Sequence, residues 1–123
     1  IRATFTRVDE SADPVVVEKT AFSCARAEGF AEKLQATGAT QALLFGIEAH
    51  VCLLQTALDL AASGYQVHVP ADAISSRTLQ NKENALYRLR RAGVVITNTE
   101  SALFEMLDKA EGDAFKAISR LIR

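Results

Sequence analysis

The stretch Gln41-Ala42-Leu43-Leu44-Phe45-Gly46 decides the fold class, because it separates two kinds of hydrophobic pattern. The run Gln41–Phe45 is short, apolar and bounded by Gly46, which predicts a strand buried on both faces of a sheet. Ala49–Ser63 then carries apolar side chains at helical spacing. Those helical positions are Val51, Leu54, Ala57, Leu58 and Ala61. A buried strand followed by an amphipathic helix is typical of a parallel α/β sheet.

The same alternation continues on both sides of this segment. Strands are predicted at Val15–Val17, Tyr65–Val69 and Val94–Thr97, and Ala71–Arg77 is predicted as a loop. Helices are predicted at Ala25–Thr37, Leu79–Ala92, Ser101–Lys109 (N-capped by Asn98 or Thr99) and Ala114–Leu121. We therefore predict a single domain over residues 1–123, with a three-layer Rossmann-like fold in which helices cover both faces of a parallel sheet.

Composition excludes several classes of protein. The chain has 123 residues, 49% of them hydrophobic, which fits one globular domain. Lys plus Arg total 14 and Asp plus Glu total 15, so no basic surplus indicates nucleic acid or an anionic membrane as a partner. The longest apolar runs are far shorter than the roughly 20 residues of a membrane span. The 2 cysteines are too few for a disulfide framework, which favours the cytoplasm.

Ligands of parallel sheets bind beyond the carboxyl ends of the strands, so the loops there are the places to search. Cys52 follows the strand Gln41–Phe45 at the start of a helix, where the helix dipole favours a thiolate nucleophile; the alternative is a small buried side chain. Lys19 follows the strand Val15–Val17 and could activate the thiol and move a proton; the alternative is a solvated lysine.

A third group of polar residues, Asp72, Ser75, Ser76 and Arg77, follows the strand Tyr65–Val69. These residues could bind a polar substrate, but ordinary turn chemistry explains them equally well. The two histidines, His50 and His68, and the two cysteines have no zinc-site spacing, and no glycine-rich phosphate loop follows a strand. We therefore predict no metal and no cofactor.

Four ordered motifs resemble the isochorismatase-like cysteine hydrolases, in particular the isochorismatase domain-containing branch. The resemblance covers the chain from about Val15 to its end. The motifs are Glu18-Lys19-Thr20-Ala21-Phe22-Ser23, Leu44-Phe45-Gly46-Ile47-Glu48-Ala49-His50-Val51-Cys52, Asp72-Ala73-Ile74-Ser75-Ser76-Arg77 and Thr99-Glu100-Ser101-Ala102-Leu103-Phe104.

The resemblance implies a chemistry for these positions. The family uses an Asp–Lys–Cys triad, in which Cys52 matches the nucleophile and Lys19 the lysine. It also has a cis peptide at the position of Ile47–Glu48, and the N–H groups of Glu48 and Cys52 would form the oxyanion hole. The implied reaction is attack on an amide or related carbonyl, followed by hydrolysis of an acyl-enzyme. The expected substrate contacts around the thiol are Phe22, Ile47, His50 and Ser76.

Two departures limit what can be transferred. The family's catalytic Asp follows a first strand, and Asp9 and Asp13 precede Val15–Val17 too closely to stand on a separate core strand. The chain therefore resembles the C-terminal two-thirds of the family domain, and we expect about 50–80 further residues upstream or from another chain. In addition, Ala49 and His50 replace the Thr and Asp common in nicotinamidases, which makes nicotinamide a poor substrate candidate.

Two functions remain open at this point. The first is a cysteine hydrolase of a small-molecule substrate, with no nucleic acid and no membrane as partners, that works as a homo-oligomer. The second is a catalytically inactive binding or assembly module that keeps the fold, since one triad member has no counterpart.

Overall fold

The computed structural model describes residues 2–5, 15–107 and 109–122. Its central sheet is parallel and has the order β3-β5-β7. The strands are β3 (Gln41–Leu43), β5 (Gln66–Pro70) and β7 (Val95–Thr97). Leu43 lies opposite His68, which lies opposite Val95. The predicted parallel α/β sheet is confirmed.

Two small pairs of strands stand beside this sheet. β1 (Arg2–Phe5) and β2 (Val15–Glu18) pair antiparallel, and β4 (Gly46–Ile47) and β6 (Ile74–Ser75) pair parallel. β2 corresponds to the predicted strand Val15–Val17, whereas β1 was not predicted. The possible acids Asp9 and Asp13 lie outside the described residues.

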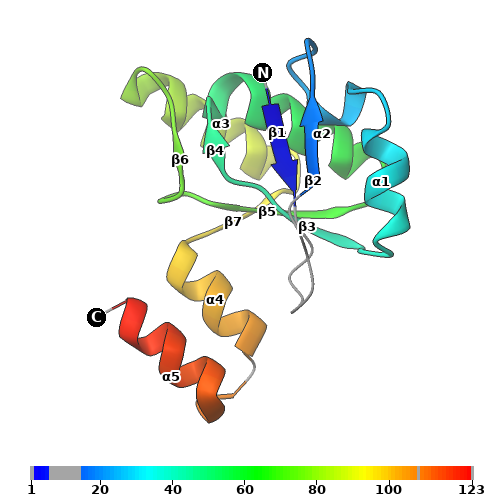
Figure 1. Ribbon diagram of the computed structural model, residues 1–123. Coiled ribbons are helices and arrows are strands. Elements are labelled where there is room, and N and C mark those ends of the chain that lie inside the picture. Colours follow the sequence, from blue (N-terminus) through cyan, green and yellow to red (C-terminus); the bar gives the residue numbers. More distant parts are fainter. Residues whose placement is uncertain (1, 6–14, 108, 123) are drawn as a thin grey trace.

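Helices lie on both sides of the sheet (Figure 1). α2 (Leu54–Ala62) and α3 (Leu79–Arg91) lie on one side, and α4 (Thr99–Leu107) and α5 (Gly112–Leu121) on the other. The shorter helices are the 3-10 turn η1 (Cys24–Arg26), α1 (Phe30–Ala36) and the π-helix η2 (Ala49–Leu53). The buried core joins sheet and helices through Val67, Val69, Leu54, Ala57, Leu60, Ala85 and Leu89.

Two of the predicted helices differ from the observed helices at their N-terminal ends. The single helix Ala25–Thr37 is wrong, because Gly29 has φ +71° and separates η1 from α1. The helix Ala49–Ser63 is present, but its first turn is the π-helix η2 rather than α-helix. A π-helical turn is rare and is found frequently at functional sites. Asn98 caps α4 as predicted, since its Oδ1 accepts the Ser101 N–H at 2.8 Å.

Two predictions for loops and strands are also corrected. The strand Gln41–Phe45 is not buried on both faces: β3 ends at Leu43, and Phe45 is 69% exposed. The reason is that β3 pairs only with β5 in the described part of the chain. The predicted loop Ala71–Arg77 contains the short strand β6, which forms because Gly46 and Ile47 pair with it.

Candidate active site

Cys52 lies in the π-helix that follows β4. Its side chain is partly exposed, and the thiol is free. Glu48 directly precedes this helix, and the Ile47–Glu48 peptide bond is cis, as the resemblance implied. The Glu48 carbonyl accepts the N–H groups of Val51 and Leu53, at 3.1 and 3.2 Å. These two hydrogen bonds hold the turn that carries Cys52 against the end of β4.

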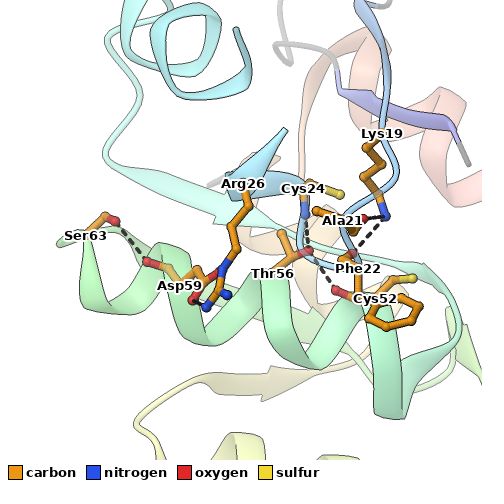
Figure 2. Close-up of polar contacts among 9 residues, drawn as sticks. All are labelled: Lys19, Ala21, Phe22, Cys24, Arg26, Cys52, Thr56, Asp59 and Ser63. Carbon is orange, nitrogen blue, oxygen red and sulfur yellow. Dashed lines mark hydrogen bonds and ion pairs between the residues drawn. The ribbon is translucent and has the colours of Figure 1, made fainter. Parts of the chain in front are cut away.

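Lys19 lies just after β2 and is only 7% exposed. Its Nζ donates hydrogen bonds to the carbonyl oxygens of Ala21 at 2.9 Å and Phe22 at 2.8 Å. A buried ammonium needs such acceptors, because losing water without replacement is costly. Figure 2 shows Lys19 reaching toward this loop, with the Phe22 side chain beside that of Cys52. The two carbonyls thus fix the ammonium relative to the loop that borders the thiol.

A cleft of about 370 Å³ opens at Cys52. Phe22, Glu48, Val51, Cys52 and Arg77 line it, so β2, β6 and η2 contribute through their ends and loops. Phe22 is 54% exposed and supplies an apolar wall, while Glu48 and Arg77 supply charge. A small organic molecule with one polar end fits such a lining.

Glu48 and Arg77 form an ion pair in the wall of this cleft. Arg77 donates from Nε and one Nη to the two carboxylate oxygens of Glu48, both at 3.0 Å. This bidentate geometry fixes both side chains. The hydrogen bond from Arg77 lowers the pKa of Glu48 below its ordinary value, and the same contact raises the pKa of Arg77. Glu48 therefore stays a carboxylate in neutral solution.

His50 connects Glu48 to the loop after β6. Its Nδ1 lies 3.0 Å from the Ser76 hydroxyl, and its Nε2 lies 3.8 Å from Glu48 Oε2. Both ring nitrogens thus face neighbouring protein groups. The imidazole thus contacts Glu48, which lines the cleft, whereas neither His50 nor Ser76 is among the lining residues.

Asp72, from the polar cluster after β5, has a structural contact. Its carboxylate accepts the Thr99 N–H at 2.8 and 3.1 Å and so binds the first turn of α4. Burial is the largest single effect and acts to raise the pKa of Asp72, but hydrogen bonds from Thr99 and from the Asp72 backbone, together with the charge of Lys82, lower the pKa overall. Of this cluster, only Arg77 reaches the cleft.

An isochorismatase domain matches residues 2–101. The chain belongs to the isochorismatase family. It is 40% identical over 121 residues to isochorismatase domain-containing protein 1 of Danio rerio, covering 98% of this chain and 43% of that protein. The family resemblance seen in the four motifs is confirmed.

Solved structures agree with this family. MAR1 ribonuclease from Caenorhabditis elegans is 35% identical with a TM-score of 0.77, covering 85% of this chain and 53% of that one. YcaC from Pseudomonas aeruginosa, solved with hexane-2,5-diol and covalent acrylamide, is 25% identical with a TM-score of 0.78, covering 82% of this chain and 51% of that one. The chain thus spans about half the length of these isochorismatase-like proteins or less.

The structure brings together most of the residues singled out from the family motifs. Phe22, Glu48 and Cys52 line one cleft, and Lys19 is fixed to the loop beside it. Ile47 is 75% exposed and lies outside the lining. Val51 is a lining residue that the sequence pattern assigned only to the inward face of a helix; its position one residue before Cys52 was the available signal.

Neither a metal site nor a membrane span appears in the described ranges. Within residues 2–5, 15–107 and 109–122, no group of three or more His, Cys, Asp or Glu could hold a metal ion. Across those same residues, no helix is long and apolar enough to cross a bilayer.

Proposed function

We propose that the protein is a cysteine-dependent hydrolase of a small amide or related carbonyl compound, with Cys52 as nucleophile and Lys19 as its proton-transfer partner. One observation supports this most strongly. The partly exposed thiol of Cys52 opens into a cleft whose bordering loop holds a buried ammonium. A sulfur nucleophile at an open cleft and a cation on the bordering loop are the groups that acyl transfer to a cysteine requires.

The proposed reaction has two halves. In the first, the Cys52 sulfur, as the thiolate, attacks the substrate carbonyl carbon, a C–S bond forms, and the oxygen becomes negative. The N–H groups of Glu48 and Cys52 would stabilise this oxyanion. The carbonyl then re-forms as the C–N bond breaks, and the amine leaves with a proton from the Lys19 ammonium. In the second half, water attacks the thioester and gives a proton to the now neutral Lys19 amine; the C–S bond breaks, the acid product leaves, and the Cys52 thiolate and Lys19 ammonium are restored.

Side chains around the thiol would select the substrate. Phe22 offers an apolar face, and the Glu48–Arg77 pair offers charge. Ile47, His50 and Ser76 would contribute by shaping the rim, since His50 and Ser76 contact each other behind it. The similar YcaC structure, solved with covalent acrylamide, is consistent with a small amide as ligand.

Selective alkylation tests this function. Iodoacetamide near neutral pH should label Cys52 much faster than Cys24, as measured by mass spectrometry of peptides over time. Cys24 is a matched control because it is also free and partly buried. Cys24→Ala should leave the rate at Cys52 unchanged. Equal, slow labelling of both thiols would contradict the proposal.

A non-catalytic binding or assembly module is the second candidate, because no described residue supplies the family's catalytic Asp. This candidate predicts no turnover of amides, esters or thioesters by any version of the protein, including a longer one. Because the similar C. elegans protein is described as a ribonuclease, RNA belongs in the same panel. Turnover that is lost in Cys52→Ala would rule out the binding module. RNA cleavage that persists in Cys52→Ala would show that another site carries that activity.

We further propose a reducing compartment, the cytoplasm, and self-association as the working state. Both cysteines are free thiols, which suits a reducing environment. Phe45, just after β3, and Ile47, in β4, are 69% and 75% exposed; among the described strands β3 pairs only with β5, and a second copy of the chain is the proposed cover.

A further inference from the structure

Thr56 makes two hydrogen bonds that join separate parts of the candidate site. Its hydroxyl donates to the Cys52 carbonyl at 2.7 Å and accepts the Cys24 backbone N–H at 2.9 Å. The side chain is buried, with only 4% of the residue exposed. A hydroxyl can donate only one hydrogen bond, and the Thr56 hydroxyl donates it to the Cys52 carbonyl.

These two bonds connect Cys52 to the loop that holds Lys19. The Lys19 ammonium is bonded to Phe22, two residues before Cys24, and Cys24 is bonded to Thr56 (Figure 2). The contacts therefore run from Lys19 through the loop to Thr56 and on to Cys52. Cys24 and Thr56 are 32 residues apart in the sequence, so helix α2 alone does not produce this connection.

A second contact joins the same two elements at the surface. Arg26 of η1 donates to both carboxylate oxygens of Asp59 on α2, at 2.9 and 3.2 Å. This ion pair is largely exposed and does not reach Cys52. It anchors η1 to α2 generally, whereas the Thr56 hydroxyl bonds to the carbonyl of the nucleophile itself.

We propose that Thr56 is a positioning residue that sets the Cys52 thiol against the Lys19 loop. This inference rests on the proposed role of Cys52 as nucleophile. The Thr56 hydroxyl fixes the Cys52 carbonyl from one side and the loop from the other. Loss of the hydroxyl frees both, so the ammonium and the thiol no longer share a defined geometry. Small displacements of reacting groups have large effects on rate.

Three variants test this role through the rate of Cys52 alkylation. Thr56→Val keeps the shape and removes the hydroxyl, and Thr56→Ser keeps the hydroxyl. Ser63→Ala is the matched control, because Ser63 donates to the Asp59 carbonyl four residues earlier in the same helix but makes no bond to η1 in the described structure. We expect Thr56→Val to slow labelling of Cys52 by about tenfold or more. Thr56→Ser and Ser63→Ala should match the wild type.

The rate at Cys24 separates positioning from loss of stability. An unfolded Thr56→Val protein would label faster at Cys24, because that thiol becomes exposed, whereas loss of positioning slows Cys52 and leaves the rate at Cys24 unchanged. Selective labelling in the wild type that persists in folded Thr56→Val would overturn this inference and leave the hydrolase proposal intact. Absence of selectivity in the wild type would instead overturn the hydrolase proposal.

Amide exchange gives a measurement that does not depend on whether the valine variant folds. In the wild type, the Cys24 N–H should exchange slowly with solvent, because Thr56 accepts it in a buried position. Exchange at the rate of an open loop would show that the connection is not made in solution and would overturn the inference.

Discussion

At the scale of single residues, the Glu48–Arg77 pair links a candidate site to a measurable pH dependence. The hydrogen bond from Arg77 places the pKa of Glu48 below its ordinary value of 4.5. A group with a depressed pKa in the folded state stabilises the fold above its unfolded pKa, and this contribution is lost as pH falls through the folded value. The contribution of the pair is therefore fully present at neutral pH.

Glu48→Gln should lower the melting temperature slightly at pH 7, because the amide cannot accept the charge-assisted bidentate pair from Arg77. The difference from the wild type should shrink as pH falls from the ordinary Glu value of 4.5 through the lowered pKa of Glu48, because the wild-type carboxylate then becomes protonated. Calorimetry from neutral to acidic pH measures it. In an Arg77→Gln background the effect of Glu48→Gln on the melting temperature should disappear. A difference in melting temperature between Glu48→Gln and the wild type that stays constant with pH would contradict this role of the ion pair.

Single residues also show how far sequence predicts a site. Cys52 and Lys19 belong to recognisable motifs at the carboxyl ends of strands, so both could be named in advance. Thr56 could not, because a threonine in an amphipathic helix has no distinctive pattern. Its role depends on Cys24, which η1 brings close only after folding. Arg77 is intermediate: the loop was identified, but its pairing with Glu48 was not.

At the scale of elements, α3 is the helix whose packing can be tested most simply. Leu89 is fully buried in the core, and Leu79 at the start of the same helix is 70% exposed. Leu89→Ala should reduce the free energy of unfolding by about 2–5 kcal/mol, since it leaves a cavity. Leu79→Ala should change it by less than about 0.5 kcal/mol. Urea unfolding measures both, and equal effects would contradict the packing.

The accuracy of predicted elements depends on how local their causes are. The helix Leu79–Ala92 was predicted almost to the residue, because its apolar spacing and Gly93 are local signals. Ala25–Thr37 failed because Gly29 adopts positive φ inside an otherwise helical pattern. The strand β6 was missed because two residues carry no strand pattern, and it exists through its pairing with Gly46 and Ile47.

At the scale of the whole molecule, loops from separate strand pairs meet at one place. The segments after β2, β4 and β6 contribute Phe22, Cys52 and Arg77 to a single cleft, and β4 and β6 follow the parallel strands β3 and β5 along the chain. Parallel strands bring their carboxyl ends to the same edge of a sheet, so the fold class alone predicted that edge. It did not predict that the Lys19 loop is held there by a hydroxyl on α2, since that contact is set by side-chain packing.

The outer edge of the sheet, along β3, can be tested for self-association. β3 has one partner among the described strands, and Phe45 and Ile47 stand exposed next to it. Unpaired edges with apolar side chains invite association with another chain. We expect sedimentation velocity to show assembly that increases with protein concentration, and Phe45→Glu to shift it toward the monomer. Leu79→Glu is the control, because Leu79 is equally exposed but lies on α3. A wild type that stays monomeric at all concentrations, or an equal shift in both variants, would contradict association through this edge.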